Sequence, residues 1–554
     1  MERTYELPPS LPADLEAFRE QTERFQKGEI SATQYRAVRV PQGIYEQRQD
    51  GAYMLRVRLP AGRILPHQMR KLAHVACTYG SGKLHLTTRQ DIQIHDVSLK
   101  DIHPALVELF GAGLSTKGGG GNTVRNITAC PDAGVCPKEV FDISPSAVAL
   151  TEFLLSDPVS FQLPRKYKIA FSGCSEDCMG AAVNDLGFIA QPGESRLGYA
   201  VYAGGGLGPH ARVGQLLEAF VPVDEAHLVA EAVKRVFDKH GNRKNKQRAR
   251  LRYLVEEKGF DAFRALYRDE LARLRKESPA APTLRPITPR LEGERIDGVP
   301  PADGFGSWRR SNVTEQKQPG YYLVHVPVSL GEVAAGTMEQ LAEIADRFGE
   351  GTIRTTPSQN LVFRWISEAD LPSLHRELSK LGLAGSVPPV LREMIACTGA
   401  NTCRLGICLS QGLAAASREA LENAGLDLDE AVSLRLHING CPNSCGRHAV
   451  ASIGLVGAAR RLNDRLTPHY MVQLGGVLGE GRTKLATGKE MIPARNLPAF
   501  LVEFLRDFRG SQQYPDFDAY LESGGRDEAA RIAGAYKEIP TFEEDETFYY
   551  DWGA

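Results

Sequence analysis

The segment "NGCPNSCGRH" (residues 439–448) contains two cysteines, Cys441 and Cys445, with three residues between them. Glycine before the first cysteine and proline after it predict a loop, because glycine allows unusual backbone conformations and proline cannot donate a backbone hydrogen bond. A second pair with a wider gap, Cys397 and Cys403, lies upstream in "ACTGANTC" (residues 396–403). Together the four thiols form a quartet with the pattern C-x5-C-x37-C-x3-C.

The same pattern occurs earlier in the chain, at Cys130, Cys136, Cys174 and Cys178. Each cysteine of the later set follows its counterpart by a constant offset of 267 residues (397 − 130 for the first thiol of each set). Four cysteines that recur at one constant offset predict an internal duplication. We call the two sets the N-terminal quartet and the C-terminal quartet.

The residues upstream of each quartet repeat as well. Residues 53–95 and 321–363 each read as strand, helix, strand. The two predicted helices carry apolar residues at i, i+3, i+4 and i+7, which is typical of a helix with one buried face: Met69, Leu72, Ala73 and Ala76 in the first, and Met338, Leu341, Ala342 and Ala345 in the second. We therefore predict an α+β fold in which each half is a small α+β unit followed by a larger α/β unit. The predicted segments are 1–120, 121–275, a linker at 276–320, 321–388 and 389–554.

Composition narrows the class of protein. The 554 residues carry a formal net charge of −2, which gives no electrostatic reason to expect a nucleic-acid partner. No uninterrupted apolar run is long enough to span a membrane, and the first residues lack the apolar core of a signal peptide. We therefore expect a cytoplasmic protein with no membrane association. Because the cytosol keeps thiols reduced, the ten cysteines favour a role other than disulfide formation.

Each quartet has three possible roles: an iron–sulfur cluster, a zinc site, or free thiols. Structural zinc sites usually place two to four residues between paired cysteines, and the gap of five lies outside that range. Four cysteines in two loops suit a cubane cluster, whose larger size tolerates wider spacing. The spacing therefore favours a cluster and leaves zinc and free thiols as the alternatives.

Taken together, "ACTGANTC" and "NGCPNSCGRH" resemble the signature of the siroheme-dependent sulfite and nitrite reductases, and the duplicated layout extends this resemblance over nearly the whole chain. The resemblance implies a pseudo-twofold fold with a ferredoxin-like unit and a siroheme and Fe–S unit in each half. It also implies that the C-terminal quartet binds a [4Fe–4S] cluster and that Cys445 additionally ligates the siroheme iron. In most of the family the first half has lost its cysteines. We expect the retained N-terminal quartet to hold a second cluster, with zinc or a relic site as alternatives.

The resemblance further implies an anion pocket above the siroheme, formed by Arg56, Arg125, Lys166 and Lys168. Such a pocket needs cations, because sulfite and nitrite are anions whose oxygens must be protonated before they leave. Lys166 and Lys168 would project to the same side of a strand.

In the second half these cations are depleted. The counterparts of Lys166 and Lys168 are Ser433 and Arg435, and only Arg125 keeps its residue type, as Arg392. We therefore expect a single catalytic site, formed by the C-terminal quartet and the cations of the N-terminal half.

Siroheme carries eight carboxylates, so its cradle should be rich in cationic groups and backbone N–H groups. By their position in the family, the candidate cradle residues are Arg89, Asn122, Arg243 and Lys244. The glycine-rich loops at Gly205 and Gly475 are further candidates, because their backbone N–H groups can bind carboxylates; hairpin turns are the alternative for these loops.

Lys168 favours sulfite as the substrate. Nitrite-specialised relatives typically carry Asn at that position, and an added cation favours the more highly charged sulfite. Nitrite is the alternative, because "CTGANTC" is closer to the nitrite-type loop. A second alternative is a non-catalytic electron-transfer or tetrapyrrole-binding module. No flavin or nicotinamide domain is evident, so we expect a separate electron donor, ferredoxin.

Overall fold

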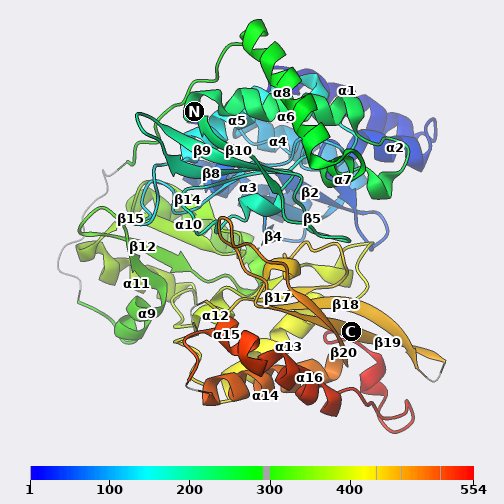
Figure 1. Cartoon of the computed structure of the whole chain (residues 1–554), viewed down its shortest axis with the longest axis vertical. Coiled ribbons are helices and arrows are strands. Elements are labelled where there is room, and N and C mark those ends of the chain that lie inside the picture. Colours follow the sequence, from blue (N-terminus) through cyan, green and yellow to red (C-terminus); the bar gives the residue numbers. More distant parts are fainter. Residues whose placement is uncertain (1, 291–299, 432, 463, 512) are drawn as a thin grey trace.

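The computed structural model describes residues 2–290, 300–431, 433–462, 464–511 and 513–554. Part of the predicted linker, residues 291–299, lies outside the described residues. The described strands form four sheets of five strands each, two in each half of the chain. Figure 1 shows them with helices packed around them. No described helix is long and apolar enough to cross a membrane.

The first and third sheets belong to the two smaller units. Their strand orders are β1-β2-β5-β4-β13 and β11-β12-β15-β14-β3. The strands are β1 (Ile44–Glu46), β2 (Ala52–Val57), β3 (Arg63–Ile64), β4 (Lys83–Leu86), β5 (Ile92–Ser98), β11 (Val313–Glu315), β12 (Tyr321–Val326), β13 (Glu332–Ala334), β14 (Ile353–Thr355) and β15 (Leu361–Ser367). The helices are α1 (Leu11–Gln26), α2 (Ala32–Arg39), α3 (Pro66–Tyr79), α4 (Ile102–Gly111), α9 (Phe305–Asn312), α10 (Ala335–Arg347) and α11 (Leu371–Lys380).

The predicted apolar stripes lie on α3 and α10. All eight stripe residues are buried, and they belong to one hydrophobic core that both small units share. Helices α3 and α10 also contact each other. The helical periodicity therefore predicted the buried faces correctly.

The two small units exchange edge strands. Strand β3 from the first half pairs antiparallel with β14, and β13 from the second half pairs antiparallel with β4. Two equivalent glutamines also form hydrogen bonds between the halves. Gln90 Nε2 donates to the carbonyl of Thr355, and Gln359 Nε2 donates to that of Leu86, both at 2.9 Å. Each half thus completes the sheet of the other, which no local sequence pattern indicates.

The second and fourth sheets carry the quartets. Their orders are β10-β9-β8-β7-β6 and β16-β17-β18-β19-β20, and in each sheet the three strands nearest the β6 or β16 edge are parallel. The strands are β6 (Thr128–Ala129), β7 (Ile169–Ser172), β8 (Leu186–Pro192), β9 (Leu197–Ala203), β10 (Gln215–Pro222), β16 (Ile395–Ala396), β17 (Leu436–Asn439), β18 (Ile453–Leu462), β19 (Arg465–Leu474) and β20 (Thr487–Pro493). Their helices are α5 (Ser144–Leu155), α6 (Ala226–His240), α7 (Leu251–Lys258), α8 (Phe260–Glu277), α12 (Pro389–Arg392), α13 (Ser410–Asn423), α14 (Leu497–Gly510), α15 (Phe517–Tyr520) and α16 (Arg526–Ala535).

The cysteine loops follow the carboxyl ends of neighbouring parallel strands. Cys130 and Cys397 come directly after β6 and β16, and Cys174 and Cys441 come one glycine after β7 and β17. Because such strand ends meet at one edge of a sheet, pairs that are distant in sequence converge there. The sheet topology therefore explains how two C-x5-C and two C-x3-C segments form two quartets.

The two C-x3-C loops share a backbone conformation. Asp177 (φ 46°) and Ser444 (φ 54°) are left-handed, and so are Gly180 (φ 65°) and Arg447 (φ 62°). A non-glycine residue with positive φ is uncommon, so the match at equivalent positions supports the duplication.

Candidate active site

The C-terminal quartet lies in a hydrogen-bonded loop region. Gly440 N–H donates to Cys397 Sγ (3.2 Å), and Asn443 Nδ2 donates to Cys441 Sγ (3.4 Å). Burial, and to a lesser extent the neighbouring Cys445, raise the pKa of Cys397 to about 11. A bound metal deprotonates such thiols outright. The N–H donors are therefore placed to stabilise thiolates that a metal centre would create.

Loops of the N-terminal half contact this quartet. Thr88 Oγ1 donates to the carbonyl of Cys445 (2.7 Å). The Arg48 N–H donates to the carbonyl of Thr402, and Arg404 Nε donates to that of Gln47. The C-terminal cysteine loops are thus held against the half of the chain that carries the predicted cations.

Arg56 and Arg125 converge on one carbonyl group. Their Nη1 atoms each donate to Gly119 O at 3.0 Å. Arg125 Nη2 also contacts the hydroxyl of Tyr45 (3.3 Å), and the Arg56 guanidinium lies over the Tyr45 ring. The structure therefore brings together two of the four predicted anion-binding residues.

Lys166 and Lys168 lie in the segment immediately before β7, near enough to Cys445 for a thiolate there to raise the pKa of both lysines. Burial lowers the pKa of Lys166 to about 7, helped by Arg250 and Arg125, whereas a Cys445 thiolate raises it. The pKa of Lys168 is lowered too, mainly by burial and then by Arg89. Because Cys445 acts on both lysines, the two halves meet at this point.

Asp185 organises the lysine strand. Its carboxylate accepts hydrogen bonds from the Lys168 backbone N–H (2.8 Å) and from Arg250 Nε and Nη2 (3.0 and 2.8 Å). Both Asp185 and Arg250 are buried. The pair fixes the position of Lys168 and places a further guanidinium near both lysines.

Among the described residues, the predicted cations have no carboxylate within ion-pairing distance; they are Arg56, Arg89, Arg125, Lys166 and Lys168. Burial lowers the pKa of Arg89 to about 9, and its Nε has no hydrogen-bond partner in the described part of the chain. Buried charges are normally paired. Such a cluster of unpaired cations facing a cysteine thiol fits a polycarboxylate such as siroheme together with a small anion.

The predicted cradle residues do not all lie at one place: some are hydrogen-bonded beside the lysine segment, and others are exposed on the surface. Arg89 donates to Asn184 Oδ1 and to the carbonyl of Ile169, beside the lysine strand. Asn122 Oδ1 accepts a hydrogen bond from Arg165. Arg243 and Lys244 are exposed, and Arg243 forms an ion pair with Asp238.

The two predicted glycines are in close packing contacts. A Cβ at Gly205 would lie 2.4 Å from Ala182 O, and one at Gly475 would lie 2.2 Å from Arg526 Nη2. These contacts explain the absence of a side chain at both positions, and their role in cofactor binding stays a prediction.

The N-terminal quartet is assembled in the same way. Cys130 and Cys178 have their Sγ atoms 3.5 Å apart, and Cys130 and Cys136 both raise the pKa of Cys174, after burial. In the described part of the chain, no three Cys, His, Asp or Glu side chains converge on a single metal ion. All ten cysteines are free.

Sequence reasoning missed two residues that contact the other half of the chain, Thr88 and Arg447. It also missed Tyr45 and Asp185, which are hydrogen-bonded to predicted cations, and Arg250, which pairs with Asp185. Arg250 lies within the basic segment "NRKNKQRARLRY" (residues 242–253), from which Arg243 and Lys244 were predicted as cradle residues. Only the fold shows which residue of that run points inward.

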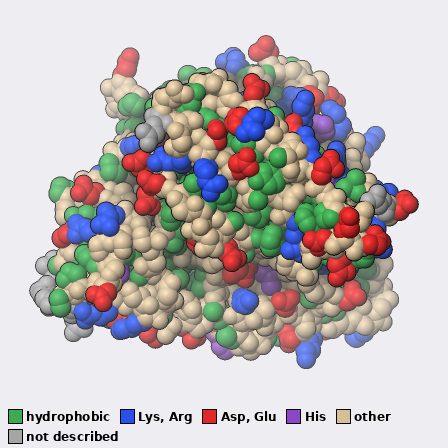
Figure 2. Space-filling model, turned by 90° about the horizontal axis from the view of Figure 1, so that it is seen from below, with side chains coloured by type: hydrophobic (Ala, Val, Ile, Leu, Met, Phe, Trp, Pro, Cys, Tyr) green, Lys and Arg blue, Asp and Glu red, His purple; other side chains and the backbone are tan. Residues whose placement is uncertain are grey.

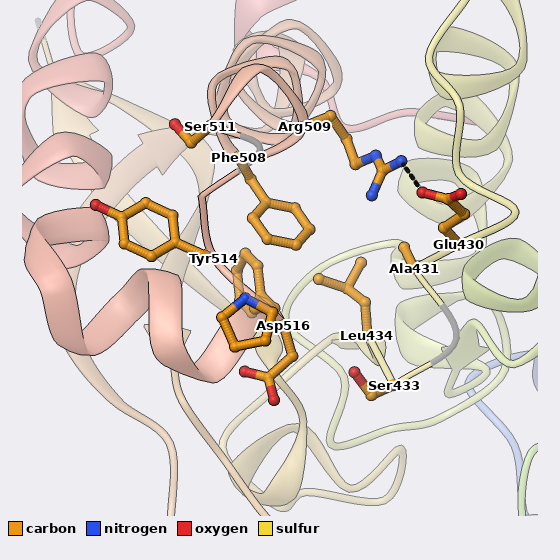
Figure 3. Close-up of a pocket in the computed structure, with 11 residues that line it drawn as sticks. Glu430, Ala431, Ser433, Leu434, Phe508, Arg509, Ser511, Tyr514 and Asp516 are labelled. Atoms are coloured by element: carbon orange, nitrogen blue, oxygen red, sulfur yellow. Dashed lines mark hydrogen bonds and ion pairs between the residues drawn. The ribbon is translucent and has the colours of Figure 1, made fainter.

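A surface pocket of about 350 Å³ lies away from these groups, between the α14–α15 region and the loop before β17 (Figure 3). Arg509 and Glu430 form an ion pair at its rim. Its lining residues include none of the predicted site residues. On the face drawn in Figure 2, acidic and basic side chains are interspersed.

Comparisons with known proteins identify the family. A family model described as the nitrite and sulphite reductase 4Fe-4S domain matches residues 120–274, and a ferredoxin-like half-domain model of the same family matches residues 45–109 and 314–381. The chain is 32% identical to a ferredoxin–nitrite reductase of Synechococcus elongatus, over 83% of this chain and 87% of that protein. It is 29% identical to a sulfite reductase [ferredoxin] of Mycolicibacterium paratuberculosis, over 79% of each chain.

A solved structure, the NirA protein of Mycobacterium tuberculosis, matches with a TM-score of 0.79 and 26% identity, over 93% of this chain and 95% of that one. The predicted α+β fold with two ferredoxin-like half-domains is confirmed. The chain belongs to the siroheme- and [4Fe–4S]-containing nitrite and sulfite reductase family, of the ferredoxin-dependent type.

Proposed function

We propose that this chain reduces sulfite to sulfide at a siroheme iron that Cys445 links to a [4Fe–4S] cluster on the C-terminal quartet. Six-electron reduction of sulfite or nitrite is the reaction class of the family. When bound, siroheme supplies an iron that can hold the anion, and the cluster supplies electrons through the shared sulfur. Sulfite takes up six electrons and seven protons to give hydrosulfide and three waters.

The chain's own residues bind the anion and deliver protons. Lys166 and Lys168 lie within the electrostatic influence of Cys445, and Arg56 and Arg125 both donate to Gly119 O. In a site where water is excluded, fixed cations stabilise negative charge more strongly than they do in water. A lysine with its pKa lowered by burial also gives up a proton more readily than an exposed one.

Lys168 is the residue that supports sulfite over nitrite. Its ammonium adds a charge that benefits a dianion more than a monoanion. Nitrite reduction at the same site is the second candidate, supported by the printed names of several relatives, such as the ferredoxin–nitrite reductases of Synechococcus elongatus and Zea mays. A non-catalytic electron carrier would have no use for unpaired cations facing the siroheme thiolate.

Electrons are proposed to come from ferredoxin. The loop that carries Cys403 also exposes Leu405 and Ile407, whose exposed fractions are 69% and 49%. An apolar patch beside a cluster ligand is suited to contact with a small electron-transfer protein.

We also propose a second [4Fe–4S] cluster on the N-terminal quartet. Its thiols follow β6 and β7 as those of the C-terminal quartet follow β16 and β17, and both C-x3-C loops have the same left-handed positions. Residues of the second half support its first loop: Arg364 donates to the carbonyls of Pro131 and Ala133.

Replacing Cys130 and Cys174 with serine should remove one cluster's worth of iron and leave siroheme bound. The reason is that these thiols belong to the N-terminal quartet alone. Iron content and the EPR spectrum of the reduced protein measure the result, and the siroheme absorbance of the same sample is the internal control. An unchanged iron count and spectrum would show that the N-terminal quartet carries no cluster.

A further inference from the structure

Gln93 lies beside Arg56 on the neighbouring strand. The two residues are cross-strand partners on β5 and β2, and Gln93 is buried. Its side-chain amide has partners at both ends when the oxygen is directed to Arg56: Oε1 accepts from Arg56 Nη2 (2.8 Å) and Nε (3.1 Å), and Nε2 donates to His95 Nε2 (3.2 Å). The opposite orientation would set the amide N–H groups against the guanidinium, donor against donor. The oxygen is therefore the end that contacts Arg56.

His95 accepts from the other end of this amide. Because its Nε2 is an acceptor, the ring proton is on Nδ1, which donates to Gln47 Oε1 (3.1 Å). Gln47 Nε2 in turn donates to Asp96 Oδ1 (2.7 Å), and Asp96 is exposed. Burial, and to a lesser extent His85, lower the pKa of His95 to about 4, so the ring is neutral near neutral pH. Each hydrogen bond thus fixes the direction of the next one.

The contacts of Arg56 leave part of its guanidinium free. A guanidinium has five N–H groups. Gln93 takes two of these and Gly119 O takes one (3.0 Å), so two remain for an anion. The ring of Tyr45 lies 5.2 Å from the guanidinium carbon. Since the planar group is held by three separate contacts, the direction of its remaining donors is fixed.

The second half has no such amide at the equivalent strand positions. The cross-strand pair equivalent to Arg56 and Gln93 is His325 and Val362, on β12 and β15. Valine has no hydrogen-bonding group that could orient a neighbour. The pair of arginine and orienting amide therefore occurs in the half that carries the predicted cations, although both sheets keep the same strand register.

We propose that Gln93 and His95 are positioning residues that fix the orientation of Arg56 for anion binding. The inference rests on the anion-binding role proposed for Arg56 above. Neither side chain needs to touch the anion, because each acts through the next hydrogen bond. Donors that are fixed before the anion arrives need no reorganisation when it binds, so they favour binding more than mobile donors do.

The test measures sulfite binding to the siroheme-containing holoenzyme by its absorbance. His95→Phe removes the acceptor of the Gln93 amide and should raise the dissociation constant for sulfite about fivefold, the effect of one hydrogen bond. Gln93→Met removes both bonds to Arg56 and should raise it at least about tenfold. His95→Gln keeps an acceptor oxygen and should restore most of the wild-type affinity.

Carbon monoxide is the second ligand in the same experiment. It binds reduced haem iron as a neutral molecule, so its affinity does not depend on the orientation of a cation. We expect the same carbon monoxide affinity in Gln93→Met, His95→Phe and wild type. Loss of both ligands together would show that these residues only support the fold of the site and would overturn the inference.

His375→Phe is the matched control. It makes the same change at a buried histidine of α11, packed against Trp308, and should alter neither affinity. Wild-type sulfite affinity in Gln93→Met, or equal losses in His95→Gln and His95→Phe, would overturn the positioning role. Unchanged sulfite affinity in Arg56→Met would instead overturn the anion-binding role of Arg56 itself.

Discussion

Cys445→Ser is expected to lose both bound siroheme and turnover, the largest effect of any single substitution in this chain. Cys445 is the last thiol of the C-terminal quartet, and a thiolate at this position raises the pKa of both Lys166 and Lys168 in the other half. In the proposed site this sulfur would hold both the cluster and the siroheme iron, so a hydroxyl at this position would break the electron path and remove the iron ligand together. Loss of the siroheme absorbance bands and of sulfite reduction with reduced ferredoxin measures the result.

Cys77→Ser is the control for this substitution. Cys77 is exposed on α3, outside both quartets, and should tolerate serine with its spectrum and activity intact. A normal siroheme spectrum with turnover in Cys445→Ser would show that this thiol is not the bridge.

Lys168→Asn is expected to lower kcat/KM for sulfite at least about tenfold relative to kcat/KM for nitrite, a differential of about 1.4 kcal/mol. The change shortens the side chain and removes a charge that Asp185 and Arg250 hold in position. At an effective dielectric constant of about 20, a charge some 4 Å away contributes on the order of 4 kcal/mol before desolvation. Sulfite carries more negative charge than nitrite and should lose more of this energy.

Two further variants show whether the effect of Lys168→Asn comes from the lost charge at this site. Lys168→Arg keeps a cation and should retain most of the preference for sulfite. Lys239→Asn makes the same chemical change at an exposed position on α6 and should have no effect on either substrate. Equal losses for both anions in Lys168→Asn would leave the preference for sulfite with no residue to explain it.

The sequence predicted those features that recur within it. The offset between the quartets predicted the duplication, and the stripe from Met69 to Ala76 predicted the buried face of α3, because both depend on spacing alone. The contact of Thr88 with Cys445, and that of Arg447 with Met179, join residues hundreds of positions apart. Spacing contains no information about such pairs, and a basic run likewise does not show which of its members is buried.

The exchange of β3 and β13 bears on the origin of the chain. A polypeptide with a single repeat could not complete its own small sheet, and it would have to borrow the edge strand of a second copy. Two such copies would form a twofold-symmetric homodimer with two identical sites. Fusion of the two genes would end that equivalence, because a substitution would then alter one site without altering the other. A lysine could then persist in one half while its counterpart became a different residue, as at Lys166 and Ser433.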